Sequence, residues 1–89
     1  MVTGEGCYDG QTNHGKVAWE IASIAAHAGI PCGLIAGRIE RSKDELAADP
    51  FAWHVSLEEL SRAHPECTSD EERLALAGEQ IARAWRETP

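Results

Sequence analysis

The sequence predicts an α/β fold in which parallel strands are joined by a crossover helix. Three features lead to this prediction: a short β-branched segment at Val2 and Thr3, an alanine-rich amphipathic stretch from Gly15, and a continuous apolar run at 32–37. A strand, a helix and a strand in this order form the unit from which parallel sheets are built, and its crossover is nearly always right-handed. We therefore expect a strand-helix-strand unit of a parallel sheet with additional C-terminal helices.

The first helix is predicted from the spacing of its apolar residues. Large apolar side chains and one alanine recur at i, i+4, i+7 and i+11, at positions Val17, Ile21, Ile24 and Ala28. The same face is widened by small side chains at Ala18, Ala22 and Ala25. We expect this face to cover the sheet, and we expect the helix to end at Gly29, because Pro31 prevents its continuation.

The second strand is predicted at Cys32–Gly37, where the apolar residues do not alternate with polar ones. Such a run is typical of a strand that is buried on both faces of a parallel sheet. A two-stranded sheet buried in this way needs more protein than the remaining residues supply. We therefore expect residues 1–89 to form one C-terminal fragment of an α/β domain, with 1–37 as its strand-loop-helix-strand unit.

The rest of the chain is predicted to be mixed in residues 38–68 and helical in 69–87. Ser42 and Glu45 form a capping-box pattern that begins a short helix, and Phe51–Val55 is a weak candidate for a third strand. Ser56 and Glu59 repeat the capping pattern for another short helix. In the final helix Ser69 is the expected N-cap, and one face carries Leu74, Ala77, Ile81 and Trp85.

The composition limits the class of protein. Fifteen acidic residues against eight basic ones give a net charge of −7, which disfavours nucleic acid and anionic membranes as partners. The three cysteines are odd in number and widely spaced, so a disulfide framework is not expected. No leader pattern follows Met1 and no apolar run is long enough to span a bilayer. We expect a cytoplasmic protein.

Most of the candidate chemistry lies in the glycine-rich stretch from Val2 to Lys16. A turn that leaves the carboxyl end of a strand and enters a helix is where open α/β sheets bind ligands, because backbone N–H groups and the positive helix end converge there. Asp9 and Glu5 suggest a metal ion, and Lys16 suggests a phosphate group. The structural alternatives are a turn aspartate, a turn glutamate and a solvated lysine.

Three other patterns are less favoured as sites. Gly10 and Gly15-Lys16 have the glycine spacing of a nucleotide-binding P-loop, but Val17 stands where a hydroxyl residue should hold Mg²⁺. His64 and Cys67 are a close pair, but two ligands do not complete a tetrahedral zinc site. A nucleophilic pair of Cys7 and His14 has no third residue to orient it.

The same stretch resembles the carboxyl-terminal part of the bacterial glycerate kinase family. The resemblance consists of Gly4-Glu5-Gly6, Asp9, Gln11-Thr12, Gly15-Lys16, Gly29-Ile30-Pro31 and Ala36-Gly37, in this order. Members of this family are longer, two-domain α/β kinases. The sequence departs from the family's pattern at Cys7, where an arginine is usual, and at Arg38-Ile39, where small residues are usual.

The resemblance implies an ATP-dependent kinase that transfers a phosphoryl group to a hydroxyl of glycerate, with Mg²⁺ as cofactor. It implies catalytic or metal-binding roles for Asp9 and Glu5, a phosphate contact for Lys16, and substrate contacts for Gln11, Thr12 and the backbone of Gly4 and Gly6. We expect the 89 residues alone to be inactive and to need either a missing N-terminal portion or self-association. The alternative is a catalytically silent α/β interaction or regulatory module.

Overall fold

A computed structural model of the chain describes residues 1–10 and 14–87. The described residues form three strands and four helices. In chain order these are β1 (Val2–Tyr8), α1 (Lys16–His27), β2 (Gly33–Ile39), α2 (Lys43–Ala48), β3 (Trp53–Ser56), α3 (Leu57–Ala63) and α4 (Asp70–Glu87). Neither α4, the longest of them, nor any other described helix has the length and apolar character of a membrane span.

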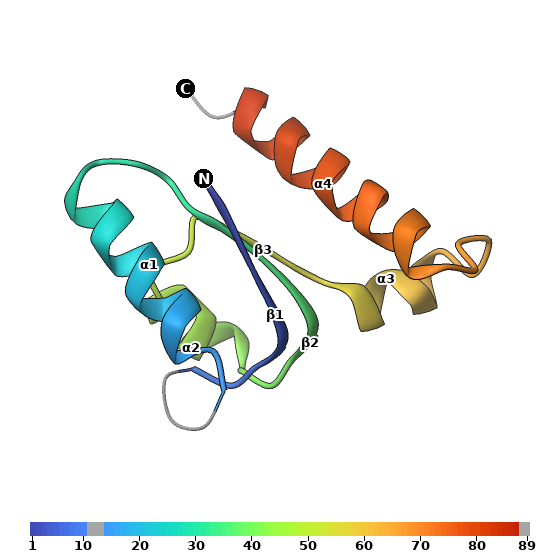
Figure 1. Ribbon diagram of the computed structural model, residues 1–89, viewed down its shortest axis with the longest axis horizontal. Helices are drawn as coiled ribbons and strands as arrows, with labels where there is room; N and C mark the ends of the chain where they lie inside the picture. The colour runs from blue at the N-terminus through green and yellow to red at the C-terminus, as the bar shows by residue number, and fades with distance from the viewer. Residues whose placement is uncertain (11–13, 88–89) are drawn as a thin grey trace.

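The three strands form one parallel sheet in the order β1-β2-β3. Thr3 is in register with Leu34, and Leu34 is in register with His54. Figure 1 shows α1 and α2 on one side of the sheet and α4 on the other. The predicted α/β class, the parallel strand-helix-strand unit and the C-terminal helices are therefore confirmed, and the weak third strand is present.

The core lies between the sheet and the first two helices. Tyr8, Leu34 and Ala36 from the sheet pack with Ala18 of α1 and Leu46 of α2. The ring of Phe51 meets the Tyr8 ring edge to face, with 5.2 Å between the ring centroids. Phe51 also contacts a second small cluster made by Ala22, Ala25 and Cys32. The core depends on small residues, which allow α1 to approach the sheet closely.

The buried face of α1 differs from the predicted one. Ala18, Ala22 and Ala25 are the buried residues of the helix, whereas Val17, Ile21 and Ile24 are 64%, 37% and 71% exposed. The periodicity correctly predicted a helix and the burial of these alanines, but it also placed the large apolar residues on the sheet. The alanine stripe faces the sheet, and the larger apolar stripe faces outward beside it.

Helix α4 covers the other face of the sheet through Ala77 and Ile81, which are both buried. The Ile81 side chain lies against Gly33, where an added Cβ would be 3.3 Å from Ile81 Cγ2. Trp85 stacks on Trp53 with 5.9 Å between the ring centroids. Two of the four residues predicted for this face are therefore buried, and Trp85 is held by a ring contact.

The predicted helix starts are confirmed by their hydrogen bonds. Ser42 Oγ accepts a hydrogen bond from Glu45 N at 3.1 Å, and Glu45 Oε1 accepts one from Ser42 N at 2.9 Å. Ser56 Oγ accepts from Glu59 N, and Ser69 Oγ accepts from Glu72 N. These caps satisfy backbone donors that a helix leaves unpaired at its first turn.

Candidate functional site

The candidate site begins where β1 ends. Asp9 Oδ1 accepts a hydrogen bond from His14 N at 2.8 Å, and Asp9 N donates to His14 O at 3.4 Å. These two bonds close the loop that follows the strand. Asp9 Oδ1 is therefore used by the loop itself, and within residues 1–10 and 14–87 no hydrogen bond to Asp9 Oδ2 is present. Gln11 and Thr12, the predicted substrate contacts, lie outside the described residues.

Two glycines in left-handed conformations allow this loop to sit against the core. Gly10 has φ 99° and Gly15 has φ 88°. A Cβ on Gly15 would be 2.2 Å from Tyr8 Cδ1, and a Cβ on Gly10 would be 3.2 Å from Arg41 Cζ. Both positions therefore require glycine for conformation, and Gly15 also requires it for space. Gly15 therefore lies against the Tyr8 ring, and Gly10 lies against the Arg41 guanidinium.

Arg41 and Tyr8 are tied together by Asp49. Arg41 donates to both carboxylate oxygens of Asp49, from Nε at 3.1 Å and from Nη2 at 2.8 Å. The Tyr8 hydroxyl donates to Asp49 Oδ2 at 2.9 Å. Burial raises the pKa of Tyr8, and the hydrogen bond to Asp49 raises it further. The hydrogen bonds to Asp49 raise the pKa of Arg41. Arg41 Nη1 also donates to Glu45 Oε2 at 2.8 Å. Tyr8 and Arg41, both bound to Asp49, lie against Gly15 and Gly10.

These contacts were not predicted from the sequence. Arg41 and Asp49 stand eight residues apart on either side of a short helix, and Tyr8 is far from both in the chain. The only local signal is that Arg41 precedes the capping box of α2 and Asp49 follows the helix. Nothing in that pattern indicates that both side chains turn toward the end of β1.

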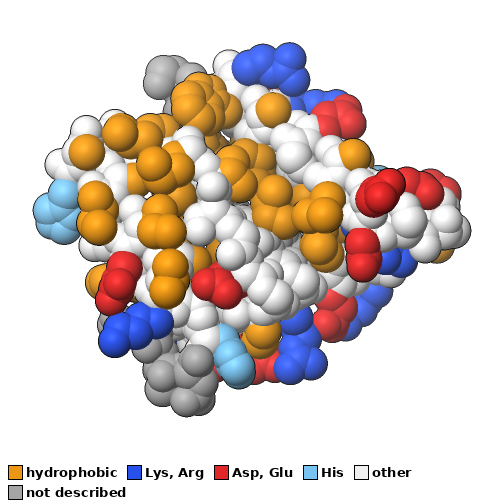
Figure 2. All heavy atoms as spheres, viewed as in Figure 1, with side chains coloured by type: hydrophobic (Ala, Val, Ile, Leu, Met, Phe, Trp, Pro, Cys, Tyr) orange, Lys and Arg blue, Asp and Glu red, His pale blue; other side chains and the backbone are white. Residues whose placement is uncertain are grey.

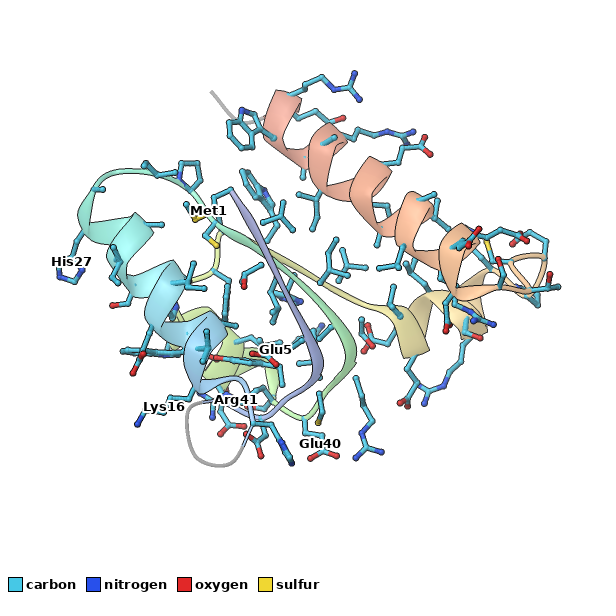
Figure 3. All side chains as sticks on the ribbon, in the orientation of Figure 1. Met1, Glu5, Lys16, His27, Glu40 and Arg41 are labelled. Carbon is cyan, nitrogen blue, oxygen red and sulfur yellow. The ribbon has the colours of Figure 1, made fainter. Side chains whose placement is uncertain are left out.

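Lys16 is the first residue of α1, as predicted, and its side chain is exposed. The first turn of α1 contains no acidic residue, and the N-cap Gly15 provides no side-chain hydrogen bond. Within residues 1–10 and 14–87, no ion pair of Lys16 is present. Figure 3 shows Lys16 at the start of α1, with its side chain pointing outward from the helix. The backbone N–H groups and the ammonium there can receive an anion.

Gly4, Glu5 and Gly6 belong to β1 rather than to the turn that the sequence suggested. Gly4 is in register with Ile35 and Glu5 with Ala36. A Cβ on Gly37 would lie 2.6 Å from Gly6 O, so position 37 has no room for a side chain beside β1. The strand continues because Gly4 and Glu5 before Gly6, and Cys7 and Tyr8 after it, have register partners in β2. The loop starts only after Tyr8.

Cys7 lies beside Arg38 in the sheet, since the two residues are in register across β1 and β2. Arg38 forms an ion pair with Glu40. Glu40 is the main cause that raises the pKa of Arg38, and a hydrogen bond with Cys7 contributes to the same shift. The two positions at which the sequence departs from the glycerate kinase pattern are therefore neighbours.

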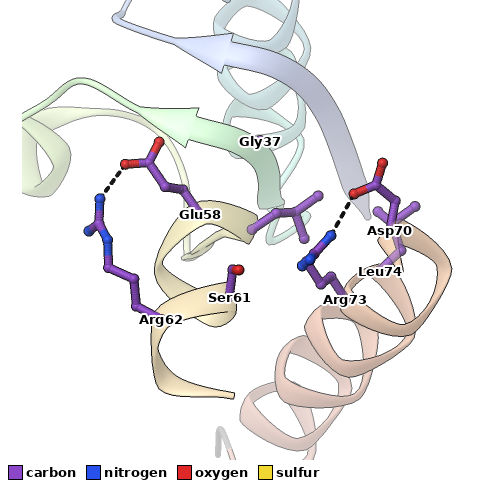
Figure 4. Close-up of a pocket in the computed structure, with 8 residues that line it drawn as sticks. Gly37, Glu58, Ser61, Arg62, Asp70, Arg73 and Leu74 are labelled. Atoms are coloured by element: carbon purple, nitrogen blue, oxygen red, sulfur yellow. Dashed lines mark hydrogen bonds and ion pairs between the residues drawn. The ribbon is translucent and has the colours of Figure 1, made fainter. Parts of the chain in front are cut away.

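A separate cavity of about 590 Å³ lies at the carboxyl ends of β2 and β3, toward α3 and α4. Figure 4 shows Arg62 and Arg73 on its two sides with Ser61 between them. Arg62 pairs with Glu58, and Arg73 Nη1 pairs with Asp70 Oδ1 at 2.9 Å. The cavity was not predicted from the sequence. Because both arginines already have carboxylate partners, its lining is balanced in charge.

Metal ligands are not gathered in the described part of the chain. Among residues 1–10 and 14–87 no group of three or more His, Cys, Asp and Glu side chains is arranged to hold a metal ion. The cysteines there are free thiols.

Comparisons with known proteins agree with the resemblance. The model of the glycerate kinase family matches residues 1–86. Two curated relatives, uncharacterized proteins of Mycobacterium bovis and Mycobacterium tuberculosis, are each 31% identical over the whole chain. The match covers 24% of each relative, so the chain spans about a quarter of their length. No solved structure matches with comparable significance. The chain thus belongs to the glycerate kinase family.

Proposed function

We propose that this chain forms part of the active site of a cytoplasmic, ATP-dependent glycerate kinase, which transfers a phosphoryl group to a hydroxyl of glycerate. The observation that carries the proposal is the loop from Asp9 to Lys16, which leaves a parallel strand and enters a helix with no acidic residue in its first turn. Phosphoryl transfer depends mainly on positioning and on neutralising charge, and this geometry serves both.

Lys16 and the first turn of α1 are proposed to bind phosphate. The lysine is poorly placed for helix stability, because the amino-terminal end of a helix disfavours cations. A phosphate between the ammonium and the free backbone N–H groups compensates for that cost. Gln11 and Thr12 are proposed to bind glycerate through neutral hydrogen bonds.

Asp9 is proposed to accept the hydroxyl proton of glycerate or to bind Mg²⁺ through its carboxylate. Mg²⁺ in kinases uses one or two carboxylates together with phosphate oxygens and water, so a single aspartate oxygen fits it without a protein-only cluster. When bound, the ion neutralises charge on the transferred phosphoryl group. Glu5, which lies four residues earlier, is proposed to reach the ion through water.

The glycines of β1 divide between two roles in this proposal. Both glycines are exposed, and Gly6 lies closer to the end of the strand, so it is the better placed of the two to donate to the substrate. Gly4 pairs with Ile35 further from the loop, and we assign it to the sheet.

Arg38 is proposed to supply the guanidinium that the family usually places at position 7. Its register partner is Cys7, so the side chain starts from the neighbouring position on the same sheet. It is 58% exposed and its partner Glu40 is 46% exposed, which makes their ion pair easy to exchange for a substrate anion.

The test places this chain in a full-length kinase. The chain replaces the matching quarter of the Mycobacterium tuberculosis relative, and ATP-dependent phosphorylation of glycerate is measured with the unmodified relative as reference. We expect activity in both proteins, and a loss of at least about 100-fold in kcat for Asp9→Asn. Glu71→Gln is the matched control, since Glu71 is an exposed carboxylate on α4.

Two outcomes contradict the proposal. Near-normal turnover of Asp9→Asn would show that Asp9 takes no part in the reaction. If the chimera and the relative both fold but neither phosphorylates glycerate, the kinase proposal is wrong. That result would favour the catalytically silent module.

A further inference from the structure

The cavity of about 590 Å³ lies between the sheet and helices α3 and α4. Figure 1 shows α4 and α1, which the ligand loop enters, on opposite sides of the sheet. The cavity reaches the sheet at Gly37, where an added Cβ would be 2.6 Å from Gly6 O. Because position 37 has no room for a side chain, a ligand can approach the backbone of β2 there. The volume is that of a small-molecule site.

Arg73 is the least exposed of the charged side chains that line this cavity. It is 22% exposed, whereas Arg62 and Asp70 are 70% and 87% exposed. Arg73 Nη1 donates to Asp70, but Arg73 Nε is buried and has no hydrogen-bond partner within residues 1–10 and 14–87. A buried donor without an acceptor costs stability, and native structures seldom keep one without a reason. A second oxygen acceptor at Arg73 would remove that cost.

The carboxylates already at the cavity do not exclude an incoming anion. The Asp70 side chain lies mostly in water, so its pair with Arg73 is screened and weak. A ligand carboxylate enclosed beside Arg73 is screened by less water, and its attraction to the guanidinium is therefore stronger. The net charge of −7 opposes anions at long range, so a ligand held here needs apolar contacts as well.

Two leucines connect the cavity to a second hollow that supplies such contacts. Leu57 and Leu74 line the cavity, and together with Gly37 they also line a hollow of about 260 Å³. This second hollow runs along Val2–Glu5 and past Ile35. Figure 2 shows apolar side chains at the centre of the face that Figure 1 presents, between β1 and α4. Leu74 is 49% exposed, so a hydrocarbon group placed against it would be removed from water together with it.

We propose that the two hollows together bind a medium-chain carboxylate, with its carboxylate at Arg73 and its hydrocarbon chain over Leu57 and Leu74 toward Ile35. The fork of a guanidinium matches the two oxygens of a carboxylate. Ser61, which lies between Arg62 and Arg73 in Figure 4, offers a hydroxyl donor to the same group.

The ligand needs both of its parts. Inorganic phosphate can pair with Arg73 but leaves the leucines uncovered, whereas a neutral alcohol covers the leucines but brings no charge to the guanidinium. Asp9, Lys16 and Arg38 line neither hollow, and of the residues proposed for catalysis or phosphate binding only Glu5 borders the second one. The inference therefore does not rest on the kinase proposal.

The test is an NMR titration of this chain with octanoate, butanoate, 1-octanol and inorganic phosphate. We expect octanoate to shift the amide signals of Gly37, Ser61 and Leu74 in a saturable manner. Octanoate should bind at least about tenfold more tightly than butanoate, because each buried methylene adds to the affinity. It should also bind at least about tenfold more tightly than octanol or phosphate, since each of these lacks one part of the ligand.

Variants of α4 separate the two parts of the site. Arg73→Gln should weaken octanoate binding at least about tenfold. Arg83→Gln is the matched control, because it removes the same charge from the same helix at an exposed pair with Glu79, and it should bind as the unmodified chain does. Leu74→Ala should narrow the difference between octanoate and butanoate. Circular dichroism checks that each variant is folded, and if Arg73→Gln is not, the ligand series and Leu74→Ala decide.

Four results overturn the proposal. The first is octanoate binding that does not saturate or does not shift these amides. The second is octanoate that binds no more tightly than butanoate or octanol. The third is phosphate that binds as tightly as octanoate, which assigns the cavity to a bare anion. The fourth is unchanged octanoate binding by a folded Arg73→Gln variant or an unchanged chain-length dependence in Leu74→Ala.

Discussion

The Tyr8 hydroxyl donates a hydrogen bond to Asp49 Oδ2 at 2.9 Å, and the same carboxylate accepts two hydrogen bonds from Arg41. Tyr8 ends β1, and Asp49 follows α2. The Tyr8 ring lies under Gly15, and the Arg41 guanidinium lies under Gly10. Gly10 and Gly15 therefore lie against two side chains, Arg41 and Tyr8, that are both bound to Asp49.

Tyr8→Phe removes one donor from Asp49 and should lower the free energy of unfolding at pH 7 by about 1 kcal/mol. Because the pKa of Tyr8 is raised in the folded state, its contribution is complete below the pKa of an unfolded tyrosine, about 10, and is lost as the pH rises above that value. Urea unfolding between pH 8 and 11 should show a steeper loss of stability in the unmodified chain than in the variant. Tyr8 is the only tyrosine, so equal losses would contradict this account.

Asp49→Asn should cost about 2 kcal/mol, because it weakens the paired hydrogen bonds of a partly buried arginine. The Asp49 side chain is 5% exposed and that of Arg41 is 21% exposed. The control is Glu79→Gln, whose pair with Arg83 is 57% and 63% exposed and should change stability by less than about 0.5 kcal/mol. Denaturant midpoints measure the stability of both variants. Equal losses would show that the Asp49–Arg41 pair stabilises the fold no more than an exposed ion pair does.

Gly15→Ala should destabilise the chain by at least about 2 kcal/mol, since the new Cβ meets the Tyr8 ring and the backbone must keep a positive φ. Gly78→Ala is the matched control. Gly78 lies in α4 with open space around it, so alanine there should raise stability by up to about 1 kcal/mol. Thermal unfolding measures both variants. An unchanged melting temperature for Gly15→Ala would contradict the close contact between Gly15 and the Tyr8 ring.

Arg38→Gln should raise the KM for the anionic substrate about tenfold in the full-length chimera, with a smaller effect on kcat, because it removes one charge-assisted contact. Adding Cys7→Arg to this variant should restore KM, since residues 7 and 38 are register partners. Steady-state kinetics of the single and double variants test whether an arginine at position 7 can replace Arg38. A double variant no better than Arg38→Gln would show that the two positions are not equivalent.

Ala22→Leu should destabilise the isolated chain by about 1–3 kcal/mol, because the side chain at this position is fully buried against Cys32 and Phe51. Ile24→Ala should change its stability by no more than about 0.5 kcal/mol, since Ile24 packs on nothing in the described core. Chemical unfolding of both variants checks the orientation of α1. The reverse order of effects would restore the face that the periodicity suggested.

The sequence predicted those features that depend on neighbouring residues. The caps at Ser42, Ser56 and Ser69, the end of α1 just before Gly29 and the parallel strand-helix-strand unit all follow from local hydrogen bonding or from the length of an apolar run. The roles of Asp9 and Lys16 stay predictions, and the kinetics of Asp9→Asn test the role of Asp9.

The sequence by itself determined the class of fold, the positions of the helices and the loop in which glycine is required, because each depends on backbone conformation over a few residues. Only the tertiary structure decided which stripe of α1 meets the sheet, since alanines and isoleucines have the same period and differ only in how closely they let the helix approach. It also decided that Tyr8, Arg41 and Asp49 meet beneath the loop, and that Cys7 lies beside Arg38. These contacts join residues that are distant in the chain, and no local pattern encodes which of them will pair.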